Sequence, residues 1–458
     1  MTSDADGSAA LGDGPAAEPG AARPGRRQAR TREAFVWVWL PGAVSPVVAG
    51  RLSWVQDAIH FNYGQSYLAR PNAIPLYEPE LPLERGDLPP PRGLWIASAI
   101  RDGAPDAWGR RVILNSRSSG RLAALRDPNG VDIDQIDELT YLLESGSDRI
   151  GNLDFQASPT AYVARQAVPA SLDELLQAAD LVQQNIPLPP ELAAALLHGS
   201  ALGGARPKAL IVDGQERWIA KFSTSQDLYP VVRAEYLAMR LAAAVGLDVA
   251  AVRLEVVANR DVLLVRRFDR MPHADGWTRR GMVSGLTLLE LDEMQARYAS
   301  YEDLAQIVRQ RFEAPTQSLR ELFGRLVFNI LCGNTDDHAR NHAAFWDGAR
   351  LSLTPAYDIC PQGRAGGEAG QAMLILGNSN LSTLALCLEA APQFRLTPTE
   401  AQALIIDQIT RLKGAWDAAC TDARLALIER DNLWGRQFLN PFAFQGAPPA
   451  IAAMALGL

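Results

Sequence analysis

Apolar side chains follow two periods along this chain, and the two periods separate strand-rich from helix-rich regions. Short alternating runs predict strands at 35–40, 51–63, 209–212, 217–221 and 261–265. Spacings of three and four residues predict helices within 94–145 and 399–437, and at 171–184 and 190–197. The helix at 171–184 begins with the capping box Ser171-x-x-Glu174. The chain is therefore expected to contain both strand-rich and helix-rich regions.

A regular apolar stripe comes just before a run of polar residues. Residues 319–331 place apolar side chains at the spacing of a buried helix, and Gly333 follows as a stop signal. Residues 335–341 then read Thr-Asp-Asp-His-Ala-Arg-Asn. Apolar segments on both sides of Asp347-Gly348 predict a hairpin. This hairpin returns the chain so that Asp358 can face residues 335–341.

The polar residues have the order of a phosphoryl-transfer site. An Asp, an Asn five positions later and a second Asp beyond a hairpin are how protein kinases place their catalytic groups. Asp336 would accept the proton of the attacking hydroxyl, while Asn341 and Asp358 would offer hard oxygen ligands to Mg²⁺. A solvated turn is the alternative, and the apolar elements on either side argue against it.

Upstream residues fit the same chemistry. The pair Gly203-Gly204 precedes Lys208 and could let backbone N–H groups approach phosphates, although a plain turn has the same pattern. Lys221 ends an apolar strand, and Glu235 lies on the next predicted helix. Kinases pair such a lysine with such a glutamate to hold the nucleotide phosphates. A snorkelling lysine with a surface glutamate is the alternative.

Composition narrows the class of protein. The chain has 458 residues, of which 48% are hydrophobic and 21% charged, as in ordinary globular proteins. A net charge of −8 argues against a body that grips nucleic acid through its own basic surface. Four cysteines without a close pair indicate reduced thiols in the cytoplasm, and no apolar run reaches the length of a membrane span. Residues 1–33, poor in large apolar side chains, predict a disordered tail.

A set of ordered motifs resembles the HipA-type serine/threonine toxin kinases of bacterial toxin–antitoxin pairs. The motifs lie at 61–63, 67–68, 72–76, 106–111, 203–208, 219–222, 267–270, 334–341 and 353–359. The resemblance covers about residues 35–437. It implies an α+β fold of the two-lobed, protein-kinase-like kind, with a β-rich N-terminal subdomain and a mostly helical C-terminal lobe.

The expected division of the chain follows from this resemblance. A disordered tail at 1–33 precedes an N-terminal subdomain at 34–165. A kinase N-lobe with the glycine loop spans 166–270, and a helical C-lobe with the catalytic loop spans 271–440. Apart from the catalytic hairpin, the segment from 271 to 362 is expected to be mostly helical, and 441–458 is expected to be a loose tail.

The resemblance also assigns roles residue by residue. It implies ATP and Mg²⁺ as cofactors, Asp336 as the base, and His338 beside the transferred phosphate. Asn341 and Asp358 hold the metal, and Ser200 is the site of an inactivating autophosphorylation. The implied nucleotide-binding residues are Gly203, Gly204, Lys208, Lys221, Glu235, Val265, Arg267 and Phe268, with adenine expected at the hinge that follows 261–265.

Expected partners come from the same source. They are a small HipB-like helix-turn-helix antitoxin, operator DNA reached mainly through that antitoxin, and a protein substrate such as an aminoacyl-tRNA synthetase. The resemblance implies a cytoplasmic protein without a membrane partner.

Some residues depart from the family pattern, and two other functions stay open. Asp337 stands where the family often has Gly and is expected to add negative charge near ATP, and Arg266 replaces an acidic hinge residue. His338 and His342 are four positions apart, as in a zinc hydrolase, but no Glu follows the first and no third ligand is evident. A non-catalytic antitoxin-binding co-repressor is the second alternative.

Overall fold

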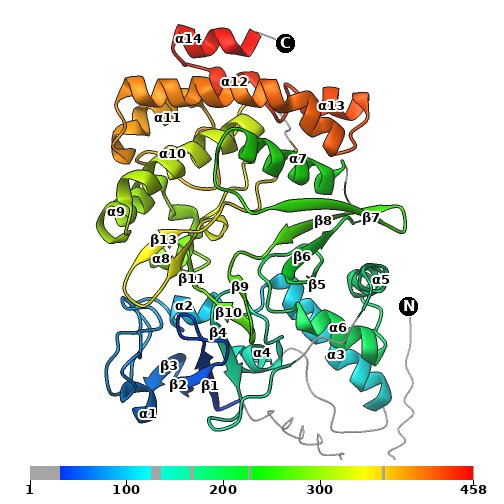
Figure 1. The fold of residues 1–458 in the computed structure, drawn as a ribbon, viewed down its shortest axis with the longest axis vertical. Helices are drawn as coiled ribbons and strands as arrows, with labels where there is room; N and C mark the ends of the chain where they lie inside the picture. Colours follow the sequence, from blue (N-terminus) through cyan, green and yellow to red (C-terminus); the bar gives the residue numbers. More distant parts are fainter. Residues whose placement is uncertain are drawn as a thin grey trace, which may run out of the picture.

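The computed structural model describes residues 31–124, 136–165, 170–224, 227, 229–363 and 367–456, without the side chains of 118–124 and 456. The tail predicted at the N-terminus lies almost entirely outside these residues. Figure 1 shows a strand-rich N-terminal region at one end, a long helical region at the other, and a second sheet between them. This arrangement is the expected α+β architecture of two lobes with an additional β-rich subdomain.

The N-terminal region is an antiparallel sheet of four strands. Its order is β3 (Ala58–Tyr63), β2 (Val47–Val55), β1 (Glu33–Val38) and β4 (Leu153–Gln156). Short helices α1 (Gln65–Leu68), α2 (Ser98–Arg101) and α4 (Glu138–Glu144) accompany it. Alternate side chains of the strands point to one face, where they form a separate core with residues of these helices.

The central sheet carries the glycine loop and the predicted nucleotide lysine. Its order is β5 (Lys208–Asp213), β6 (Glu216–Phe222), β8 (Arg260–Arg266) and β7 (Val252–Val257). Helix α7 (Val231–Ala244) follows β6, and α5 (Leu172–Gln183), with its predicted capping box, and α6 (Pro190–His198) precede β5.

Helix α3 (Ala107–Ala124) packs with the central sheet, although its sequence lies within the expected N-terminal subdomain. The buried side chains of Trp108 and Val112 join those of α5, α6, β5, β6 and β8 in one hydrophobic cluster. We call this cluster the α3 cluster. The core of the N-lobe therefore includes a helix from the preceding segment.

The C-lobe is helical. Its elements are α8 (Gly285–Leu288), α9 (Tyr301–Arg311), α10 (Pro315–Cys332), α11 (Leu384–Ala390), α12 (Pro398–Asp422), α13 (Leu427–Leu433) and α14 (Pro449–Ala452). Figure 1 shows α12 running across the top of the molecule, where it contacts α7 and α10. As predicted, α10 ends at Gly333, whose φ of 70° is left-handed.

Two expectations for the C-lobe are wrong. The segment after β8 forms strands β9 (Arg270–His273), β10 (Gly276–Arg279) and β11 (Gly281–Ser284), and β11 pairs with β12 (Ala343–Trp346) of the catalytic hairpin, which β13 (Leu351–Leu353) completes. The expected C-terminal tail instead forms a 3₁₀ helix at Pro441–Phe444 and α14, with Phe442, Phe444 and Ile451 buried. Among the described residues, no helix has the length and apolarity needed to cross a bilayer.

Candidate active site

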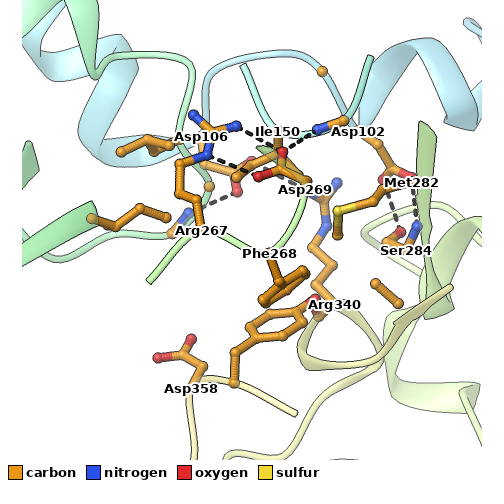
Figure 2. Close-up of a pocket in the computed structure, with 18 of the residues that line it drawn as sticks. Asp102, Asp106, Ile150, Arg267, Phe268, Asp269, Met282, Ser284, Arg340 and Asp358 are labelled. Atoms are coloured by element: carbon orange, nitrogen blue, oxygen red, sulfur yellow. Dashed lines mark hydrogen bonds and ion pairs between the residues drawn. The ribbon is translucent and has the colours of Figure 1, made fainter. Parts of the chain in front are cut away.

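One cavity of about 260 Å³ brings together most of the predicted site residues. It lies between the central sheet, the catalytic loop and the N-terminal subdomain, and Figure 2 shows Phe268 within it, between Asp358 and the side chains of Asp102 and Asp269. The predicted residues that line it are Gly203, Gly204, Lys208, Lys221, Val265, Arg267, Phe268, His338, Asn341 and Asp358. Segments separated by up to about 150 positions in the sequence therefore meet in one place.

The catalytic loop is fixed at its start by the left-handed Gly333. A side chain there would press on the backbone of Gln437, because a Cβ would lie 2.7 Å from that carbonyl oxygen. Further along, Asn341 donates from Nδ2 to the backbone oxygen of Asp336, at 3.2 Å. This bond closes the loop and leaves Oδ1 as the remaining polar atom of the Asn341 amide.

Asp336 lies exposed at the rim, outside the lining of the cavity. Desolvation raises the pKa of its carboxyl, and Asp358 and Asp337 add to that rise while His338 opposes it. A base at this position gains proton affinity from the higher pKa. The position suits a group that meets a second substrate arriving from outside the cavity.

Lys221 joins the two lobes through a pair of carboxylates. Its Nζ donates to Glu235 Oε1 at 2.5 Å and to Asp358 Oδ1. Burial opposes the charged lysine, but Asp358 and Glu235 outweigh it, and the Lys221 pKa is raised. Burial likewise opposes the ionised Asp358, yet Lys221 and Lys208 hold the pKa of Asp358 at about 2. Glu235 does not line the cavity, and its hydrogen bond to the site is the one that it accepts from Lys221.

Asp358 has an unusual backbone conformation for a residue with a side chain. Its φ is 59°, in the left-handed region, which Asp tolerates better than bulky residues. Backbone strain of this kind concentrates at functional sites. Here it accompanies a carboxylate that is 43% exposed and faces the cavity.

The glycine loop brings a second lysine to the same cavity. Lys208 lies opposite Lys221 in the register of β5 and β6, and its Nζ donates to the backbone oxygen of Gly203. Burial and the charge of Lys221 lower the pKa of Lys208 to about 8. Gly204 has a φ of +96°, a conformation that favours glycine.

The hinge residues divide between two tasks. The Phe268 ring lines the cavity and packs on Tyr357, with 5.8 Å between ring centroids. The Arg267 side chain is fully buried and donates to Asp269 and to the backbone oxygens of Asp148 and Arg149. Its guanidinium therefore fastens the N-terminal subdomain to the hinge.

Ser200 is buried within the structure. Its Oγ donates to the backbone oxygen of Leu197 at 2.7 Å and accepts from the backbone N–H of Gly146 at 3.1 Å. Phosphorylation of this hydroxyl would require the segment to open first. Ala201 and Leu202, which follow Ser200, are also buried, whereas Gly203 and Gly204 are exposed.

Asp337 does not add charge to the cavity, contrary to expectation. Its carboxylate is buried in the C-lobe, where Tyr301 Oη donates to it and His342 Nε2 lies 3.1 Å away. His338 lines the cavity, so the two histidines face different surroundings. Within the described parts of the chain, no group of three His, Cys, Asp or Glu residues is arranged to hold a metal ion.

The donor set fits Mg²⁺ held jointly with a nucleotide. Asp358 is ionised, Asn341 offers an amide oxygen, and both residues line the cavity. Mg²⁺ in phosphoryl-transfer sites takes one or two protein oxygens, while phosphates and water supply the rest. Asn341 and Asp358 are therefore the residues that would hold it.

The cavity has a wall that the sequence motifs did not predict. Four residues that line it are Asp102 at the C-cap of α2, Asp106 just before α3, Ser284 at the end of β11 and Arg340 in the catalytic loop. The only sequence signals were the motif at 106–111 and the place of Arg340 inside the catalytic stretch. Neither signal states what these side chains contact.

Comparison with known proteins agrees with this geometry. Residues 200–416 match the family model described as "HipA-like C-terminal domain". The chain is 29% identical over 208 residues to "Putative kinase Y4mE" of Sinorhizobium fredii, covering 42% of this chain and 49% of that protein. It is 25% identical over 183 residues to "Serine/threonine-protein kinase toxin HipA" of Shewanella oneidensis, covering 35% of this chain and 42% of that protein. The matches span about half the length of these relatives.

A solved structure shares the fold over nearly the whole chain. It is HipA from Shewanella oneidensis MR-1, in a complex with HipB and its operator DNA, and it covers 92% of this chain and 96% of its own with a TM-score of 0.58 and 18% identity. The matched segment contains the glycine loop, Lys208 and Lys221, and the predicted site residues Asp336, Asn341 and Asp358. Residues 200–416 are therefore similar to HipA-like C-terminal domains, and the chain shares the fold of the solved HipA.

Proposed function

We propose that this protein is an ATP- and Mg²⁺-dependent serine/threonine protein kinase and the toxin half of a toxin–antitoxin pair. The observation that carries the proposal is the contact of Lys221 with both Glu235 and Asp358, on the wall of a cavity that also contains Asn341 and the glycine loop. Kinases use this lysine, this glutamate and this metal-binding aspartate together.

Each residue has a defined task in the proposed reaction. Lys221 and Lys208 hold the nucleotide phosphates, and Glu235 keeps Lys221 in place. Bound Mg²⁺ would neutralise charge on the phosphates, held by Asn341 and Asp358. Asp336, at the rim, accepts the proton of a serine or threonine hydroxyl as that oxygen attacks the phosphorus in line with the leaving group.

The partners follow from the family. We propose a small helix-turn-helix antitoxin that binds this chain and carries it to operator DNA, and a translation factor such as an aminoacyl-tRNA synthetase as substrate. The solved HipA of Shewanella oneidensis in complex with HipB and operator DNA supports the antitoxin. Autophosphorylation of Ser200 is part of the proposal, and it requires the buried hydroxyl to become accessible.

The test is phosphoryl transfer by purified protein with ATP and Mg²⁺, followed by mass spectrometry of the protein and of added synthetases. Asp336→Ala should lower the rate by about 10² to 10⁴, because a positioned base contributes that much. Asp358→Ala and Lys221→Ala should weaken ATP binding. Asp422→Asn, a matched surface change on α12, is the control and should behave as wild type.

The alternatives have distinct outcomes. Wild-type protein that does not bind ATP would leave a non-catalytic antitoxin-binding role. Hydrolysis that needs zinc and no ATP would favour a metal hydrolase. Transfer at the wild-type rate by folded Asp336→Ala would refute the assignment of the base.

A further inference from the structure

We propose that Asp106 is a positioning residue that couples the glycine loop to the catalytic loop through the N-terminal subdomain. Its carboxylate lines the cavity together with Asp102 and Arg340, as Figure 2 shows. The proposal adds to the proposed function a residue at the start of α3, which precedes residues 200–416 in the chain. Only the predicted effect of Asp106 on ATP affinity rests on the proposed function.

The first contact of Asp106 is with the glycine loop. Its Oδ2 accepts from the backbone N–H of Gly204 at 2.9 Å. Trp108 of α3 adds to the contact. Its backbone N–H donates to the backbone oxygen of Gly204 at 3.3 Å, and its indole N–H donates to the backbone oxygen of Lys208 at 3.0 Å. The first turn of α3 therefore sets the conformation of the loop from 203 to 208.

The second contact of Asp106 is with a closed ring of alternating charge. Asp106 Oδ1 lies 3.7 Å from Arg101 and 3.4 Å from Arg340, and Glu293 closes the ring at 2.9 Å from Arg101 and 2.7 Å from Arg340. The four residues come from α2, the start of α3, the loop after α8 and the catalytic loop. Ion pairs that share partners hold one another in place better than isolated pairs do.

The electrostatics of Asp106 agree with a fixed, ionised carboxylate. Burial opposes its charge, but Arg340, the N–H of Gly204 and Arg101 outweigh it and lower the Asp106 pKa below its usual range. One oxygen thus serves the glycine loop and the other serves Arg340. Movement of either loop changes the energy of the other, because both depend on the same carboxylate.

The same contacts argue against phosphate binding by Asp106 itself, since a carboxylate repels phosphate oxygens. Its effect on ATP is therefore indirect. With Asp106 in place, the loop presents its remaining backbone and Lys208 to the cavity in one conformation. Without Asp106, ATP binding must itself order the loop, and this ordering lowers the affinity for ATP.

The test begins with nucleotide-free protein, so that it does not depend on kinase activity. Hydrogen exchange is measured on peptides from 199–208 and, for comparison, from α12, in wild type, Asp106→Ala, Asp106→Asn and the surface control Asp422→Asn. We expect at least about tenfold faster exchange at 203–204 in Asp106→Ala, with α12 unchanged, because a lost charge-assisted hydrogen bond has that effect. Asp106→Asn keeps an acceptor oxygen and should retain most of the protection.

ATP affinity is then measured by calorimetry with Mg²⁺. Asp106→Ala should weaken it about tenfold, and Asp106→Asn about threefold, because the amide keeps the loop contact and loses the ring. Equal exchange at 203–204 in Asp106→Ala and wild type would overturn the proposal, as would an increase no larger than that in α12. Wild-type protein that fails to bind ATP would refute the proposed function, and the exchange result would still decide the role of Asp106.

Discussion

Asp336 and Asp337 are neighbours in sequence and opposites in environment. Asp336 is exposed at the rim, whereas Asp337 is buried against Tyr301 and His342. Asp337→Ala should lower the free energy of unfolding by about 2 kcal/mol, because buried hydrogen-bonding groups lose a charged partner. Asp336→Ala should change it by no more than about 0.5 kcal/mol, as exposed substitutions do. Urea unfolding of both variants measures these changes. A larger loss of stability in Asp336→Ala than in Asp337→Ala would contradict the prediction.

Lys208 predicts a pH dependence of nucleotide affinity. Burial and Lys221 lower its pKa to about 8, so it is charged at pH 7 and loses its proton as the pH rises toward 9. Affinity for ATP should therefore fall over this range in wild type and stay level in Lys208→Arg, whose guanidinium remains charged. Calorimetry at pH 7 and pH 9 gives the comparison, and equal slopes for the two proteins would contradict it.

The same pKa has the opposite effect on stability. The folded pKa of Lys208 lies below its ordinary value of 10.5, so the unfolded chain holds the proton more tightly. The contribution of Lys208 to the free energy of unfolding is therefore least favourable below pH 8 and rises between about pH 8 and pH 10.5. Loss of this proton from folded Lys208 should therefore weaken ATP binding, while the same rise in pH increases the contribution of Lys208 to the free energy of unfolding.

Two helical glycines offer a matched test at the scale of secondary structure elements. In α3, a Cβ at Gly109 would lie 1.8 Å from the backbone oxygen of Ser200, whereas in α12 a Cβ at Gly414 would meet nothing within 4 Å. Gly109→Ala must push α3 away from the glycine loop and should destabilise the protein and weaken ATP binding. Gly414→Ala should stabilise it by about 0.5–1 kcal/mol through helix propensity.

Thermal unfolding and ATP titration of the two glycine variants decide between these outcomes. Gly109→Ala with wild-type stability and affinity would show that α3 does not press on the glycine loop. A decrease in stability for Gly414→Ala would show that α12 is more tightly enclosed than its open surroundings indicate.

Local signals predicted those elements that depend on local contacts. The capping box at Ser171, the left-handed stop at Gly333 and the turn at Asp347-Gly348 each involve residues a few positions apart, and all are present in the structure. Strand β11 could not be recognised in this way, because its partner β12 lies about 60 residues later. The packed C-terminal segment was missed because its apolar residues contact helices that are distant in the sequence.

The residues of the candidate site also differ in whether local sequence patterns could predict them. Its motif residues could be predicted because kinase chemistry demands particular side chains at short, ordered spacings. The ring of Arg101, Asp106, Glu293 and Arg340 could not, because no spacing in the sequence places these residues together. Contacts between subdomains are set by tertiary packing, and their residues carry no local pattern.

At the scale of the whole molecule, the α3 cluster predicts the behaviour of a fragment. Residues 200–416 alone lack α3, α5 and α6, and so would expose Trp218, Phe222 and Leu264, which are now buried. Such a large apolar face favours aggregation or a loosely packed state. The fragment should bind the dye ANS and lack the near-ultraviolet circular dichroism of the full chain. A monomeric fragment with a cooperative thermal transition would contradict this.

Because the central sheet packs on α3, the segment that matches the family model and the segment that forms the core of the sheet have different boundaries. The match to the family model begins at residue 200, whereas the core of the central sheet includes α3, which begins at Ala107. A fragment that begins at residue 200 would contain every proposed catalytic residue but lack the helices that cover its sheet. Transfer of this site into another protein therefore requires the central sheet together with α3, α5 and α6, which precede it in the chain.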